Sequence, residues 1–187
     1  MSKKILAAII VFLLVSISLL VIFFELQSVS LDKVSLTLED LGVGYEESDK
    51  EHITNPYVAS SGKLFEGQKI LESYKVRFTK INETGIKNDS CFIALEIGKL
   101  EDRYKEAIST IKNTTFLGYD FTEVESEKIG KESYIGEDNA TIFGVEVTIY
   151  FIVFRIGNII VAMVSSGHTL ERSIDYARIM EDNIVKA

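Results

Sequence analysis

The hydrophobic pattern of the chain begins with residues 5–24, a run of twenty residues without a charged side chain. Twenty helical residues span about 30 Å, which is the thickness of the hydrocarbon core of a bilayer. Lys3 and Lys4 precede the run and Glu25 follows it, a distribution that predicts a cytoplasmic N-terminus. We therefore predict a single-pass cell-membrane protein whose domain, residues 31–187, is extracytoplasmic.

Residues 1–30 allow two interpretations, an uncleaved signal-anchor or a cleaved signal peptide. Ser28-Val29-Ser30 offers the small residues that a signal peptidase accepts. The apolar run nevertheless exceeds the roughly 7–15 residues of a typical signal peptide. Its length favours an anchor that contacts the lipid bilayer through residues 5–24.

Alternating apolar and polar positions in the remaining domain predict a series of β-strands. The predicted strands are residues 45–53, 69–81, 91–97, 116–127, 132–136, 141–155 and 159–165. Residues 82–90 have turn composition and predict a hairpin between the second and third strands. Gly157-Asn158 predicts a second hairpin, between the last two strands.

Two segments, 101–112 and 170–185, show the apolar spacing of amphipathic helices. The strands 145–155 and 159–165 are apolar on both faces, and such strands need cover on both sides. We therefore predict an α+β domain: a largely antiparallel sheet covered by helices on both faces, that is, an α/β/α sandwich.

Composition narrows the classes of function. The chain of 187 residues has 28 acidic and 20 basic side chains, and its net charge of -8 argues against a nucleic-acid partner. A single cysteine excludes a disulfide within the monomer and a four-thiolate zinc site. Gly42-Val43-Gly44 lacks the third glycine of a dinucleotide-binding loop. The sequence therefore predicts no cofactor, no metal site and no catalytic motif.

Four asparagines match the acceptor pattern of N-glycosylation, which predicts an extracellular glycoprotein. They are Asn82, Asn88, Asn113 and Asn139. The alternative is that asparagine-rich turns simply lie beside serine and threonine. From the strand order we expect all four at one end of the sheet, opposite Gly130 and Gly157. That opposite end would present basic side chains to a partner or to anionic lipid headgroups, namely Lys99, Lys128, Lys131 and Arg155.

Three residues are candidates for chemistry, and each has a plainer structural interpretation. His168 follows two serines and is a candidate base for a surface hydrolase, but Thr169 after it suits the N-cap of the last helix. His52 lies in an acidic strand without the spacing of a calcium loop. Cys91 opens an apolar strand, and we predict a buried, inert thiol.

Residues 36–41, Gly44-Tyr45 and 153–158, followed by the closing helix, resemble PsbP-like extracytoplasmic domains. The resemblance implies an α/β/α sandwich that acts as a binding or assembly module rather than as an enzyme. The chain lacks the lipidation cysteine of prokaryotic surface lipoproteins with this domain. We therefore expect a membrane-anchored binding or assembly module of unknown ligand, with a protein partner at the cell surface. The alternatives are a solute-binding domain and a hydrolase that uses His168.

Overall fold

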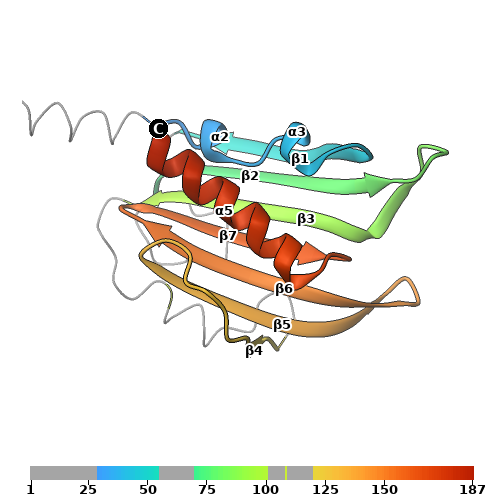
Figure 1. Ribbon diagram of the computed structural model, residues 1–187. Coiled ribbons are helices and arrows are strands. Elements are labelled where there is room, and N and C mark those ends of the chain that lie inside the picture. Colours follow the sequence, from blue (N-terminus) through green and yellow to red (C-terminus); the bar gives the residue numbers. More distant parts are fainter. Residues whose placement is uncertain (1–28, 55–69, 101–107, 109–119) are drawn as a thin grey trace, which may run out of the picture.

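The computed structural model describes residues 29–54, 70–100, 108 and 120–187 (Figure 1). In this part of the chain, seven strands form one antiparallel sheet with the order β1-β2-β3-β7-β6-β5-β4. The strands are β1 (Tyr45–Ile53), β2 (Ile70–Ile81), β3 (Lys87–Leu100), β4 (Thr122–Glu123), β5 (Glu132–Ile142), β6 (Val145–Ile156) and β7 (Ile159–Ser166). The helices are α2 (Leu31–Val34), α3 (Leu38–Leu41) and α5 (Leu170–Lys186).

Tight turns join the neighbouring strands. The Asn82 side chain accepts hydrogen bonds from the backbone of Thr84 (3.0 Å) and Ile86 (2.8 Å), which closes the β2–β3 turn. Phe143 and Gly144 form a two-residue turn between β5 and β6, with φ angles of 49° and 81°. Such a pair of positive φ angles matches the right-handed twist of the flanking strands.

The first face of the sheet packs against α5, α2 and α3, and we call it the helix-covered face. Figure 1 shows α5 lying obliquely across the sheet. The α5 helix begins at the N-cap Thr169, whose hydroxyl accepts from the backbone of Arg172 at 3.2 Å. Its buried face includes Tyr176, Ala177 and Met180, which join the apolar residues of the central strands in one core.

The other side of the sheet, which we call the second face, carries a separate apolar cluster. It contains Ile149, Phe151 and Val153 of β6 together with Ile160 of β7, and the buried Ile108 packs with them. The faces of β6 thus alternate as the sequence predicts, because Ile152 and Phe154 belong to the first core.

The prediction of a sheet covered by helices on both faces is wrong. Every described helix of a full turn or more packs on the helix-covered face. The predicted helix 101–112 lies outside the described residues, apart from Ile108. Part of the second face is instead filled by its own aromatic side chains: the rings of Phe121 and Phe151 stack with centroids 5.2 Å apart, and Tyr134 meets Phe151 edge-on at 6.3 Å.

Strand types were predicted better than strand limits. Strand β1, the β2–β3 hairpin, the β6–β7 hairpin and α5 are confirmed. The predicted strand 141–155 is wrong in extent, because the Phe143-Gly144 turn divides it between β5 and β6. Phenylalanine is not a typical turn residue, so Gly144 alone did not indicate a turn there. Of the predicted strand 116–127, residues 120–127 are described, and within them the strand is limited to the two residues of β4.

The predicted anchor, residues 5–24, lies outside the described residues. In the ranges that the structure describes, no helix combines the length and apolar character needed to cross a membrane.

Candidate binding cleft on the second face

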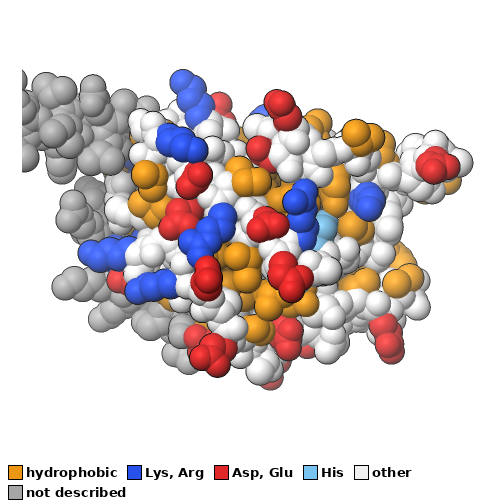
Figure 2. All heavy atoms as spheres, in the orientation of Figure 1, with side chains coloured by type: hydrophobic (Ala, Val, Ile, Leu, Met, Phe, Trp, Pro, Cys, Tyr) orange, Lys and Arg blue, Asp and Glu red, His pale blue; other side chains and the backbone are white. Residues whose placement is uncertain are grey.

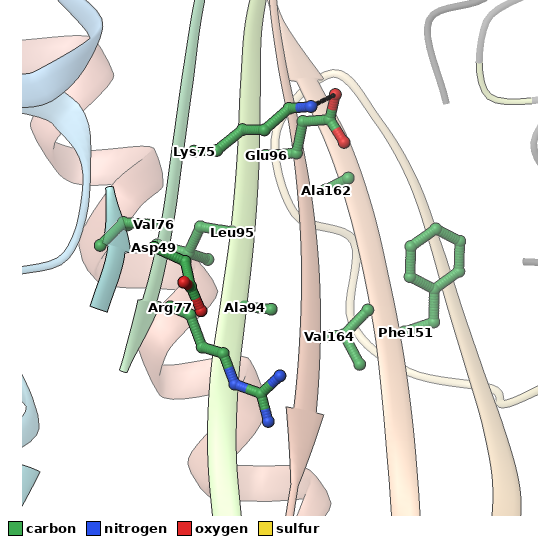
Figure 3. Close-up of a pocket in the computed structure, with 10 residues that line it drawn as sticks. All are labelled: Asp49, Lys75, Val76, Arg77, Ala94, Leu95, Glu96, Phe151, Ala162 and Val164. Atoms are coloured by element: carbon green, nitrogen blue, oxygen red, sulfur yellow. Dashed lines mark ion pairs between the residues drawn. The ribbon is translucent and has the colours of Figure 1, made fainter. Parts of the chain in front are cut away.

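A shallow cleft runs along the second face because side chains of different size stand in one row across the sheet. Arg77 pairs with Ala94, Ala94 with Val164, and Val164 with Phe151. Residues paired in this way point to the same face. Arg77 and Phe151 are three strands apart, roughly 14 Å. The small residues between them form the floor of the cleft, as Figure 3 shows.

The cleft has two connected hollows. The inner hollow has a volume of about 260 Å³ and is lined by Ala94, Ala162, Val164 and Phe151 among others. The outer hollow, about 680 Å³, extends toward the β2–β3 and β5–β6 turns. The two hollows share Ala94, Val164, Arg77 and Asp49, so they form one continuous depression.

An ion pair closes the inner end. Lys75 Nζ lies 3.6 Å from Glu96 Oε1, and Figure 3 shows this pair beyond Ala162. Burial raises the pKa of the Glu96 carboxyl, and the ammonium of Lys75 opposes that shift. The pair therefore marks the boundary where the apolar floor ends.

The outer hollow carries charged groups of both signs. The Arg77 guanidinium lies over the Phe92 ring, 4.2 Å from its centroid. No carboxylate among the described residues lies within ion-pair distance of Arg77, whereas Lys87 pairs with Glu46 at 3.6 Å. Arg77 is therefore a guanidinium on an apolar platform with its hydrogen-bonding edge available.

The backbone at the rim of the cleft is strained. Asp49 and Phe143 are the two non-glycine residues in the described part of the chain with positive φ, 50° and 49°. Both line the outer hollow. Asp49 lies at a β-bulge between Ser48 and Glu51, and such bulges redirect side chains. Aspartate tolerates left-handed backbone, whereas for most other residues it costs on the order of 1–2 kcal/mol, and for an aromatic one it is rare. Strain of this kind concentrates at functional sites, so the strained Phe143 at the rim of this hollow marks the cleft as the candidate site.

The sequence-predicted candidate His168 lies on the opposite side of the sheet, in a network that joins β1, β7 and α5. Its Nε2 lies 2.6 Å from Tyr45 Oη, and its Nδ1 lies 3.0 Å from Ser165 Oγ. Ser173 Oγ donates to Ser165 Oγ at 2.9 Å. The Tyr176 ring meets His168 edge-on at 5.7 Å.

This geometry suits a structural link. Both ring nitrogens of His168 are engaged, and Ser165 is 0% exposed, so a substrate has no path to its hydroxyl. Burial, with smaller contributions from Lys80 and Arg172, lowers the pKa of His168 to about 4. The imidazole is therefore neutral at neutral pH.

The other two candidates are also engaged in packing. His52 Nε2 lies 2.8 Å from Glu72 Oε1, and its ring meets Tyr74 edge-on. Cys91 is 6% exposed, with its sulfur 3.9 Å from His168 Nε2. Within the ranges that the structure covers, no group of three or more His, Cys, Asp or Glu side chains converges as metal ligands would.

Three of the four sequon asparagines lie at one end of the sheet. Asn82 begins the β2–β3 turn, Asn88 is the second residue of β3, and Asn139 lies near the end of β5. The antiparallel register puts these positions together, opposite Gly130 and Gly157. The expected clustering is thus confirmed for these three.

The fourth sequon asparagine, Asn113, lies outside the described residues. Whether any of the four carries a glycan stays a prediction.

The opposite end is less basic than the sequence predicts. Lys99 is 3% exposed, and its ammonium donates to the carbonyl of Val29 at 3.3 Å. Arg155 is 4% exposed and pairs with Glu132 at 2.8 Å. Neither is available to lipid headgroups. Figure 2 views the helix-covered side and shows acidic and basic side chains interspersed over it, without a patch of one sign.

The strand order and the helices on one face define a one-sheet antiparallel α+β domain with a cleft on its second face. The crystal structure of the extracellular domain of PknH from Mycobacterium tuberculosis has a similar fold. The two chains are 10% identical and superpose with a TM-score of 0.59, over 82% of this chain and 94% of that one. At this identity the likeness concerns the fold alone. No protein-family model and no curated protein sequence matches the chain, so the resemblance to PsbP-like domains stays a prediction.

Sequence reasoning missed the residues of the cleft. Asp49 looked like part of a solvated acidic strand, and Phe143 like a strand interior. Recognising the cleft required the cross-strand register, which sets Ala94 beside Val164. One usable signal was present, because a small residue such as Ala162 on a strand that is apolar on both faces leaves a gap on one of them.

Proposed function

We propose that the chain is an extracytoplasmic binding module, anchored through residues 5–24, that holds its ligand in the cleft of the second face. The observation that carries this proposal is the strained backbone of Phe143 at the rim of the outer hollow, which Asp49, the other described non-glycine residue with positive φ, also lines. The Phe143 side chain is 85% exposed, so packing does not compensate for its strained backbone. A contact made with a ligand would account for it.

The position of Val29 supports an orientation for this module. The Lys99 ammonium holds the Val29 carbonyl at the Gly157 end of the sheet, where the chain enters the domain. The outer hollow opens at the other end, beside the turns that follow β2 and β5. A domain anchored through its N-terminus would therefore present the cleft away from the membrane.

The sequons give this orientation a further consequence. Asn82, Asn88 and Asn139 lie at the same end as the outer hollow, so glycans there would flank its opening. From the sequence we expected the opposite end to remain free for a partner. The cleft instead favours a ligand small enough to pass between glycans, which supports the solute-binding alternative over a large docked protein.

The proposal is tested by purifying the full chain gently from its native membrane and identifying bound small molecules by native mass spectrometry. Ala94→Leu fills the cleft floor and should abolish the bound mass. Ala140→Leu makes the same change on the same face outside both hollows and should retain it. Equal retention by the two variants, or no bound mass in the wild type, would refute ligand binding in the cleft.

The predicted membrane topology is tested separately. Protease added to intact cells should remove the C-terminal domain and leave the first residues protected. A C-terminal tag that survives in intact cells but is cleaved after lysis would contradict an extracytoplasmic location.

A further inference from the structure

We infer that the ligand of the cleft is a single-chain amphiphile with a carboxylate head, of the fatty-acid type. The inference rests on the proposed function and adds to it the chemical class of the ligand. Its basis is the unequal distribution of apolar and charged groups along one continuous depression.

The inner hollow fits an apolar chain. Its floor consists of Ala94, Ala162 and Val164, and Phe151 forms the wall on the β6 side. The charged groups at its end, Lys75 and Glu96, lie 3.6 Å apart, so their opposite charges offset each other. Removing apolar surface from water is the favourable interaction that this hollow offers. Its volume of about 260 Å³ suits one chain rather than two.

The outer hollow fits an anionic head. The Arg77 guanidinium is positioned by the Phe92 ring and meets no carboxylate in the described part of the chain. A guanidinium presents a planar fork of donors that matches a carboxylate with two parallel hydrogen bonds. Arg77 stands where the two hollows join, so a head bound to it directs an attached chain along Ala94 and Val164.

The acidic neighbours limit the charge of the head. Asp49 and Asp89 line the same outer hollow, and each repels a second negative charge. A head with one negative charge can therefore pair with Arg77 while meeting less repulsion from these two carboxylates than a doubly charged head would. The exposed ring of Phe143 stands at the mouth, where it contacts the part of the ligand that leaves the inner hollow.

The test uses the full chain in lipid nanodiscs and dodecanoate with a photoreactive diazirine at the end of its chain. After illumination, cross-linked residues are mapped by mass spectrometry, which separates cleft binding from partition into the disc. We expect labels on β3, β6 and β7 along the inner hollow. Unlabelled dodecanoate should compete, dodecyl maltoside should compete at least tenfold more weakly, and dodecyltrimethylammonium should not compete.

Matched arginine variants test the head contact. Arg77→Gln should weaken labelling at least tenfold, because a charge-assisted bidentate pair is lost. Arg172→Gln changes another arginine that stacks on an aromatic ring, 4.6 Å from the Tyr176 centroid on the helix-covered face, and should leave labelling unchanged. Ala94→Leu should abolish labelling at the cleft.

Three results would overturn the inference: competition by the cationic amphiphile equal to that of dodecanoate, labels away from the inner hollow, or equal labelling of Arg77→Gln and wild type. Its failure is distinguishable from that of the proposed function. A co-purified ligand that Ala94→Leu loses, without cleft labelling by the probe, would retain the binding module and reject the fatty-acid class.

Discussion

The hydroxyl of Tyr45 and Nε2 of His168 lie 2.6 Å apart and join the edge strand β1 to the residue that precedes the N-cap of α5. The contact spans 123 positions of sequence. It fixes the outermost long strand to the helix-covered core, where direct packing between β1 and α5 contributes little.

Tyr45→Phe should lower the free energy of unfolding by about 1–3 kcal/mol, because it leaves a half-buried ring nitrogen without its short hydrogen bond. Urea denaturation of the domain measures this. Tyr150→Phe is the control, since the Tyr150 hydroxyl has no hydrogen-bond partner among the described residues, and it should change stability by much less. Equal losses would show that the Tyr45 contact contributes nothing specific.

The pH dependence of the free energy of unfolding should show the titration of His168. Its pKa is about 4 in the folded chain and about 6.5 when unfolded, so the unfolded state binds the proton first as pH falls. This contribution to stability is complete above pH 6.5 and is lost progressively toward pH 4. Melting temperatures of His168→Gln should fall less steeply than those of the wild type across that window. Parallel pH profiles would place the titration elsewhere.

The N-terminal limit of the domain can be tested by truncation. Val29 is buried, and its carbonyl accepts from Lys99, whose pKa is lowered by burial. A fragment that starts at residue 29 should therefore fold alone and melt at a higher temperature than one that starts at residue 31. Chemical-shift dispersion checks the fold, and equal melting temperatures would show that Val29 is dispensable.

Alanine substitutions at two glycines distinguish the cost of a strained backbone from the cost of a steric clash. A Cβ at Gly130 would meet the Arg155 carbonyl oxygen at 2.8 Å, whereas a Cβ at Gly157 meets nothing within 4 Å. Their φ angles, 62° and 60°, are nearly equal. Gly157→Ala should cost about 1–2 kcal/mol from backbone conformation alone. Gly130→Ala should cost about 1–3 kcal/mol more, since the turn must move. Similar losses in urea denaturation would contradict the close approach.

Phe143 should show a trade-off between stability and binding. Phe143→Asn places a residue that tolerates left-handed backbone before Gly144, so the domain should gain about 1 kcal/mol while ligand binding weakens. Phe143→Ala removes the ring but keeps the strained backbone, and should weaken binding without that gain. Denaturation and ligand retention are measured on both variants. Unchanged binding in both would remove Phe143 from the site.

The elements that sequence predicts well here are those with a local periodic signal. The buried positions of helix α5, such as Tyr176, Met180 and Ile184, recur at a helical spacing. The turns of the β2–β3 and β6–β7 hairpins contain glycine and asparagine. The division between β5 and β6 was missed because the first residue of the Phe143-Gly144 turn, a phenylalanine, is atypical of turns. The covering of the second face was also missed, since periodicity shows that a face is apolar and not what lies against it.

The cleft could not be predicted from local patterns, because it depends on the register between strands. Arg77, Ala94, Val164 and Phe151 come from four strands, and only hydrogen-bonded pairing aligns them. The three described sequon asparagines, Asn82, Asn88 and Asn139, were placed at one end correctly because that inference used only the direction of successive strands. Strand direction follows from counting turns, whereas register depends on bulges such as the one at Asp49.

The bulge at Asp49 also bears on self-association. An unpaired edge strand offers its backbone to any other extended chain, and proteins protect such edges with charges and bulges. Strand β1 has both: one irregularity in pairing, and a sequence, Glu46-Glu47-Ser48-Asp49-Lys50-Glu51, in which charge dominates. At the other edge, the described strand β4 has two residues. Copies of the domain at high concentration would thus repel at β1 rather than extend one another's sheets.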